Sequence, residues 1–206
     1  MTTDSGTSAA VDPGWEALAQ VAAGDVEAFA ALVESHQERL LRLCERLLGD
    51  LEEARDAAQD VFLKAFRKAG DVRPQGQVYT WLYRIAVNHC LNKLRRRKLV
   101  RFLRWDDPAE QDAPASDPPD GAADPAAELE ARHRWRTARQ AIARLPENQR
   151  LVLTLVRFEG LAYKEAAEVL GITEGAVESR LFRAMRRVEA AQEAQTSRVS
   201  MKEARR

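Results

Sequence analysis

The sequence predicts an all-α fold in which a flexible acidic linker joins two small helical domains. Apolar residues recur at spacings of three and four over most of the chain, and strand patterns are almost absent. The stretch 106–125 contains five prolines separated mainly by Ala, Gly and Asp. Such a composition cannot bury a core, so it divides the chain into two folding units.

This division predicts five segments. They are a flexible N-terminal segment (1–24), a first helical domain (25–98), the linker (99–127), a second helical domain (128–190) and a polar tail (191–206). No apolar run is long enough to cross a bilayer, and the N-terminus lacks a secretory signal pattern. The two cysteines form no disulfide framework or metal-ligand cluster. We therefore expect a reduced, cytoplasmic protein without metal or cofactor.

Charge is segregated along the chain although the net charge is zero. The stretch 91–105 holds seven Lys or Arg and no acid, whereas 106–130 holds nine Asp or Glu and no base. Separated charges create local fields that a net charge hides, so the basic stretch could face a polyanion. From charge alone, a solvated helix end explains it equally well.

The first domain is expected to contain three helices. The first carries apolar residues from Phe29 to Leu47 and ends before Gly49, a residue type that favours helix termination. The second has an alanine-rich apolar face, and its opposite face presents Asp56, Gln59, Asp60 and Leu63. A leucine within an acidic outward face suggests a partner surface, although single exposed leucines are common.

The third expected helix, over 80–98, has a broad apolar arc. Opposite this arc lies a polar stripe formed by Trp81, Arg84, Asn88, Asn92 and Arg95. Asn pairs with base edges, Arg with phosphates or bases, and Trp with an unstacked base. The alternative is that Trp81 packs against a neighbouring loop while the Asn and Arg side chains are solvated. The adjacent basic stretch favours single-stranded or melted DNA.

The second domain carries the spacing of a helix-turn-helix over 163–180. Gly171 suits the left-handed turn, and Thr173 can cap the second helix. That helix has a tight apolar stripe. The residues on its other side are Ser179, Arg180, Phe182, Arg183 and Arg186. Because Arg can bind guanine through two hydrogen bonds and Phe can contact a thymine methyl, this face predicts DNA binding.

Four motifs resemble one family. The run VYTWLYRIAVN (78–88), followed by LRRR (94–97), resembles the promoter-melting region of extracytoplasmic-function (ECF) sigma factors. LPENQR (145–150) and VESRLFRA (177–184) resemble the second DNA-binding domain of that family. The resemblance covers roughly residues 25–98 and 128–190, in the family's order and with a linker between them.

The resemblance implies an alternative sigma factor that is not an enzyme and that directs core RNA polymerase to promoters. The residues implied to dock on the clamp helices of the largest polymerase subunit are Asp56, Gln59, Asp60 and Leu63. Those implied to line the melted −10 strand are Trp81, Arg84, Asn88, Asn92 and Arg95. Those implied to read the −35 element are Ser179, Arg180, Phe182, Arg183 and Arg186. A cognate anti-sigma factor is a further implied partner, and direct membrane insertion is not expected.

The chain departs from the family's pattern in places. VRPQG (72–76) stands where Phe-Arg-Gly-Asp/Glu-Ser is common in the loop implied to hold a flipped base, so the base preference is left open. Ala162 replaces a Ser or Thr cap, and Glu178 could accept a hydrogen bond from cytosine or repel phosphate. A stand-alone helix-turn-helix regulator would explain only the second domain. An interaction adaptor explains neither basic surface, and a helical enzyme would lack a catalytic constellation.

Overall fold

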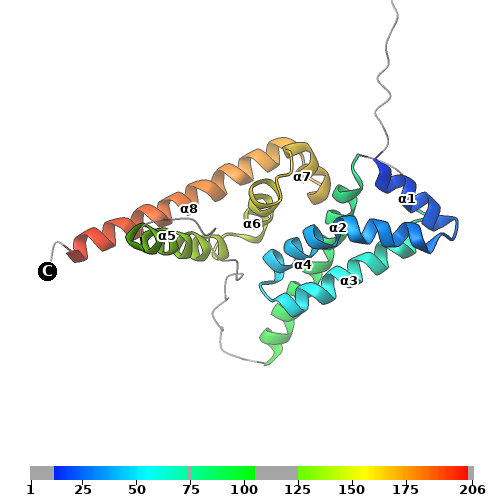
Figure 1. Ribbon diagram of the computed structural model, residues 1–206. Coiled ribbons are helices and arrows are strands. Elements are labelled where there is room, and N and C mark those ends of the chain that lie inside the picture. Colours follow the sequence, from blue (N-terminus) through cyan, green and yellow to red (C-terminus); the bar gives the residue numbers. More distant parts are fainter. Residues whose placement is uncertain (1–11, 74–75, 105–124, 204–206) are drawn as a thin grey trace, which may run out of the picture.

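The computed structural model describes residues 12–73, 76–104 and 125–203, and every regular element in these ranges is a helix (Figure 1). Helices α1–α4 form one half and α5–α8 the other, which confirms the predicted all-α fold with two helical units. The elements are α1 Pro13–Ala22, α2 Val26–Leu48, α3 Leu51–Lys68, α4 Val78–Arg104, α5 Pro125–Ala143, α6 Glu147–Leu153, the π-helical turn η1 Thr154–Phe158, α7 Tyr163–Leu170 and α8 Glu174–Glu203.

Helices α2, α3 and α4 pack against one another around the core of the first half. The Asp25 and Asp50 carboxylates accept hydrogen bonds from backbone N–H groups at the starts of α2 and α3. Gly49 follows α2 in the left-handed conformation, with φ 76°. The fully buried side chains of these three helices include Leu40, Leu43, Cys44, Ala54, Ala57, Val61 and Leu82.

Helix α1 shows that residues 13–22, within the segment 1–24 that was predicted to be flexible, are helical, while residues 1–11 lie outside the described residues. Asp12 caps the helix, and Pro13 occupies a position where a backbone N–H would have no helical partner. The buried side chains of α1 are Trp15, Leu18 and Val21. Because burying a large apolar side chain is worth about 1.5–3 kcal/mol, packing against α2 holds this short helix in place.

The second half contains the predicted helix-turn-helix, formed by α7 and the start of α8. Gly171 between them has φ 64°, and the Thr173 hydroxyl accepts a hydrogen bond from Ala176 N–H at 3.2 Å. At the start of α7, Glu165 Oε2 accepts a hydrogen bond from Ala162 N–H at 2.8 Å. Only this half of a capping box is present, because the alanine side chain has no oxygen to accept the reciprocal bond.

Three helices extend past the predicted domain boundaries. Helix α4 continues to Arg104, α5 starts at Pro125, and α8 continues to Glu203, where a polar tail was expected. The stretches 91–104 and 176–203 contain neither Gly nor Pro and are rich in good helix formers, so nothing local ends these helices. Most of the predicted linker, residues 105–124, lies outside the described residues.

Helices α5, α6 and α7 each pack against α8, and α7 also packs against α4 of the first half (Figure 1). This contact places the first helix of the helix-turn-helix beside the start of the helix that carries the polar stripe. Within the described ranges, no helix has the length and apolarity needed to span a lipid bilayer.

Candidate nucleic-acid interface

Helix α3 separates a buried face from an exposed one as predicted. The exposed face contains Asp56, Gln59, Asp60 and Leu63, and the Leu63 side chain is 47% exposed. Phe66, one turn further along, is also exposed and stacks edge-on against Phe29, with ring centroids 5.1 Å apart. Two apolar side chains therefore accompany the acidic groups, and together they offer both charge and apolar area to a partner.

His89 of α4 borders the α3 face. Its Nε2 lies 3.5 Å from the Asp60 carboxylate, and its Nδ1 contacts the Lys64 ammonium group. Burial, followed by the nearby Lys64 charge, lowers the pKa of His89 despite the Asp60 carboxylate. The imidazole is therefore held in its neutral form at physiological pH.

The polar stripe of α4 is exposed at four of its five predicted positions: Arg84, Asn88, Asn92 and Arg95. Trp81 is only partly exposed, and its ring centroid lies 5.9 Å from that of Trp15 in α1. Packing thus accounts for part of the Trp81 surface, although its partner is a helix rather than the loop considered from the sequence. Arg84, Asn88 and Asn92 retain hydrogen-bonding capacity toward a ligand, whereas the Arg95 guanidinium lies 3.9 Å from the Glu147 carboxylate of α6.

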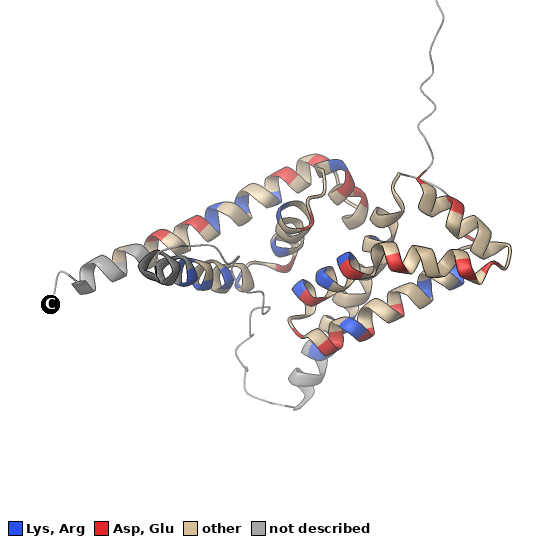
Figure 2. Cartoon of the chain, viewed as in Figure 1, with Lys and Arg blue, Asp and Glu red and all other residues tan. Residues whose placement is uncertain are grey.

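The basic side chains toward the end of α4 fall into two groups, those that form ion pairs with α3 and those that are exposed. Lys93 and Arg97 form ion pairs with Glu53 of α3, and the Lys93 Nζ to Glu53 Oε2 distance is 3.3 Å. Arg96 is exposed, as are Arg84 and Arg95 on the stripe. Figure 2 shows that basic and acidic residues are distributed along both halves of the chain. Part of the stretch therefore stabilises the fold, and part remains open to phosphates.

Helix α8 has a buried inner side and an exposed outer side that carries the predicted base-reading residues. Val177, Leu181 and Ala184 are buried on its inner side. The predicted base-reading residues Ser179, Phe182, Arg183 and Arg186 are exposed, and Arg180 is partly exposed.

Phe182 is 64% exposed, and Arg183 is held in place by Ser179. Arg183 Nη2 donates to the Ser179 hydroxyl at 2.7 Å, and Nε donates to the Ser179 carbonyl at 3.1 Å. A guanidinium whose rotamer is already fixed loses less conformational entropy when it binds a base.

The two halves meet through a polar cluster that sequence analysis did not predict. The Glu159 side chain, which follows η1, is 3% exposed, and its carboxylate pairs with the Arg46 guanidinium of α2. The Tyr83 hydroxyl of α4 donates to Glu159 Oε2 at 2.9 Å. The Tyr79 hydroxyl likewise donates to Glu165 at the start of α7. Two carboxylates of the second half are therefore satisfied by groups of the first half.

Both tyrosines of this cluster stay protonated at physiological pH. Burial, followed by the hydrogen bond to Glu165, raises the pKa of Tyr79 to about 12. Burial, followed by the charge of Glu159, raises the pKa of Tyr83 as well. The Arg39 guanidinium lies 5.1 Å and 5.9 Å from the centroids of the Tyr79 and Tyr83 rings. The two hydroxyl groups are therefore dependable donors to the carboxylates.

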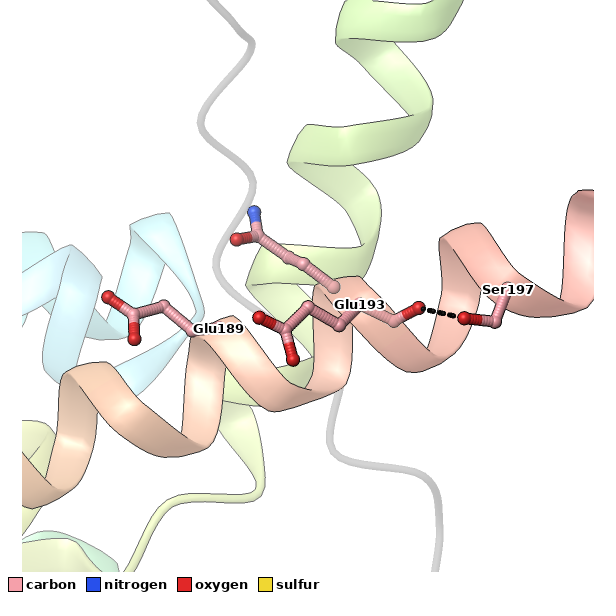
Figure 3. A pocket seen from close by; sticks show the side chains of 4 residues that line it. Glu189, Glu193 and Ser197 are labelled. Atoms are coloured by element: carbon pink, nitrogen blue, oxygen red, sulfur yellow. Dashed lines mark hydrogen bonds between the residues drawn. The ribbon is translucent and has the colours of Figure 1, made fainter.

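Two buried thiols and one shallow hollow lie outside the three predicted surfaces. Cys44 and Cys90 are buried free thiols, and their mutual hydrogen bond, followed by burial, raises the pKa of Cys44 well above its usual range. A hollow on α8 is lined by Glu189, Gln192, Glu193 and Ser197 (Figure 3). All four lining residues are polar and belong to α8, and the Ser197 hydroxyl already donates to the Glu193 carbonyl at 3.0 Å.

Comparisons with known proteins place both halves in one family. Sigma-70 region 2 matches residues 32–100, and sigma-70 region 4 matches residues 136–188. The RNA polymerase sigma-H factor of Pseudomonas aeruginosa is 38% identical, over 84% of this chain and 90% of its own length. The ECF RNA polymerase sigma factor SigM of Mycobacterium tuberculosis is also 38% identical, over 84% and 81% of the two chains. The matches thus extend across both halves of the molecule.

Solved structures show the same fold. CnrH, in complex with the cytosolic domain of CnrY, is 27% identical with a TM-score of 0.63, over 89% of this chain and 99% of that one. The sigma factor RpoE of Bartonella quintana, crystallised with the anti-sigma factor NepR, is 23% identical with a TM-score of 0.63, over 82% and 98% of the two chains. The second likeness concerns the fold alone.

Proposed function

We infer that this chain, which belongs to the ECF group of the sigma-70 family, is an alternative sigma factor that works through three surfaces. It binds core RNA polymerase and directs promoter-specific transcription initiation. The observation that carries this conclusion is the presence of both family regions in one chain, at 32–100 and 136–188, on separate helical halves. A stand-alone DNA-binding regulator would account for the second region only.

Each surface has a distinct part in the proposal. The exposed α3 face with Asp60 and Leu63 docks on the polymerase clamp helices. The α4 stripe with Asn88 captures unpaired bases of the −10 element. The α8 face with Phe182 and Arg183 reads the −35 element in the major groove. The exposure of these side chains, together with the buried opposite faces of their helices, supports the three assignments.

Promoter binding then requires the two halves to separate. The −10 and −35 elements lie more than two helical turns apart, which is about 70 Å along the duplex. In the contact described above, Tyr79 at the start of α4 is hydrogen-bonded to Glu165 at the start of α7. A molecule closed in this way cannot place α4 and α8 on both elements at once.

The proposed mechanism uses binding energy rather than covalent chemistry, so the chain is not an enzyme. Its partners are core RNA polymerase, promoter DNA and a cognate anti-sigma factor, and its place of action is the cytoplasm, where the polymerase works. No cofactor enters this mechanism.

Dependence on polymerase tests the function directly. Fluorescence anisotropy of a labelled promoter duplex should show weak binding by the isolated protein and tight, sequence-specific binding once core polymerase is added. The reason is that core polymerase fixes the spacing of two weak contacts and so raises their effective concentration. Tight specific binding that core polymerase leaves unchanged would instead identify a stand-alone regulator.

A further inference from the structure

One carboxylate caps the starts of two helices that are far apart in sequence. Asp12 Oδ1 accepts a hydrogen bond from Gly14 N–H at 2.8 Å, in the first turn of α1. Asp12 Oδ2 accepts a hydrogen bond from Val78 N–H at 2.9 Å, at the first residue of α4. Because the first N–H groups of a helix have no partner within it, this acceptor ties the beginning of α4 to α1.

A second bond links α1 to the segment that precedes α4. The indole Nε1–H of Trp15 donates to the carbonyl oxygen of Gly76 at 2.8 Å. Trp15 is buried, and its ring packs against Trp81 of the α4 stripe. Gly76 has φ +64°, a conformation that side chains rarely adopt, so the carbonyl is presented by an unusual backbone turn.

The approach of α1 to α4 is also unusually close. A Cβ atom added at Gly14 would lie 2.9 Å from Val78 Cβ, closer than such atoms pack in proteins. Only glycine therefore lets the two helix starts meet at this distance. Together, these contacts fix both ends of the segment 76–78 and one side of Trp81 to α1.

We propose that Asp12 and Trp15 are positioning residues for capture of the unpaired −10 strand. They hold segment 76–78 and Trp81 in place before DNA arrives. This inference depends on the proposed function, because it assigns α4 and the preceding loop to the −10 element. It goes beyond that function by giving a role in promoter opening to α1, a helix that itself carries none of the assigned DNA-binding residues.

Preorganisation is the physical reason for such an arrangement. A base that leaves the duplex must gain enough stacking and hydrogen bonding to offset the cost of unpairing. If segment 76–78 had to become ordered during capture, that ordering would subtract from the binding free energy. The buried Trp15 indole and the Asp12 cap order segment 76–78 before DNA binds. Contacts between the α4 stripe and the unpaired strand therefore contribute fully to the binding free energy.

The test compares holoenzymes that contain Trp15→Phe, Asp12→Asn or the control Asp25→Asn. Phenylalanine keeps an apolar ring but has no N–H to donate to Gly76. Asparagine at position 12 keeps its size but cannot accept from both backbone groups. Asp25 caps α2 by accepting from the Glu27 and Ala28 N–H groups at 2.9 Å and 3.2 Å, so its variant carries the same chemical change at the start of another helix.

Three readouts separate positioning from general stability. Binding to a fluorescent single-stranded oligonucleotide, taken from the −10 region of a start site mapped with the wild-type holoenzyme, should weaken on the order of three- to tenfold in both test variants. Preference at the captured base position should flatten. Amide hydrogen exchange at 76–78 should accelerate in both test variants, whereas their affinities for core polymerase and for the −35 duplex should stay within about twofold of wild type. The control Asp25→Asn should stay within about twofold of wild type in all these measurements.

The outcomes distinguish this inference from the proposed function. If wild type discriminates the −10 oligonucleotide from a scrambled one but both test variants bind it normally, the positioning role is wrong and the function stands. If wild type shows no discrimination, the assignment of α4 is wrong, and the inference falls with it. Should Trp15→Phe unfold, Asp12→Asn decides, because Asp12 is partly exposed and its replacement has nearly the same size. Equal loss of core, −35 and −10 binding would mean general destabilisation and would also overturn the proposal.

Discussion

Replacing Glu159 with alanine should open the contact between the two halves. The substitution leaves the Arg46 guanidinium and the Tyr83 hydroxyl without their common acceptor. Removing one partner of a fully buried ion pair costs about 3–5 kcal/mol. The Arg46 side chain is 27% exposed and can be partly rehydrated, so we expect the contact to weaken by about 2–3 kcal/mol. That loss shifts the ratio of closed to open molecules by a factor of roughly 30 to 150.

Small-angle X-ray scattering measures this change directly, because separated halves raise the radius of gyration and the maximum dimension. Glu159→Gln retains an acceptor for Tyr83 but loses the charge, so it should lie between wild type and Glu159→Ala. Glu38→Gln removes an exposed i,i+4 pair with Arg42, and such pairs contribute about 0.3–0.5 kcal/mol. This control should scatter like wild type. A Glu159→Ala protein with unchanged dimensions and unchanged amide exchange in α7 would refute the reasoning.

The remaining predictions concern the docking face, the −35 face and one histidine. The double variant Asp60→Lys/Leu63→Arg should lose at least about 2 kcal/mol of core-polymerase affinity in a competition binding assay. Circular dichroism should show unchanged helicity, and normal competition would show that another face docks. Phe182→Ala and Arg183→Ala should each cost about 1–3 kcal/mol at a matched −35 duplex and relax preference at one base position, which anisotropy on single-base variants would detect. Burial and basic neighbours on α3 and α4 lower the pKa of His89 in the folded protein. The folded state therefore favours the neutral imidazole, and this contribution to the free energy of unfolding is present above about pH 6.5 and is lost as pH falls through the lowered pKa. The free energy of unfolding measured in urea should decline toward pH 5, and this decline should be smaller in His89→Gln. Identical pH profiles for the two proteins would contradict the prediction.

Most helices could be predicted from the sequence because their signals are local. The apolar period of α3, the glycine after α2 and the Thr173 cap of α8 each involve residues within a few positions of one another. The division of α3 into buried and exposed faces followed from the same period. The exposure of Phe182 and Arg183 followed from the buried stripe on the opposite side of α8.

The missed features depend on contacts between distant parts of the chain. Glu159 is separated by 113 residues from Arg46 and by 76 from Tyr83, so no local pattern marks it as a buried acid. The π-helical turn before it also interrupts the regular helical period. Helix α1 did carry a local signal, namely Asp12-Pro13 followed by apolar residues three apart at Trp15, Leu18 and Val21. Its contact with Trp81 could not be read from that signal.

Run-off transcription with core RNA polymerase tests the central claim most directly. Fragments of the host genome are transcribed by core polymerase alone, by core polymerase with this protein, and by core polymerase with the Asp60→Lys/Leu63→Arg variant, and the RNA 5′ ends are mapped. We predict discrete start sites, preceded by a common pair of elements, only when the wild-type protein is present. Start sites that are the same with and without the protein would contradict the account.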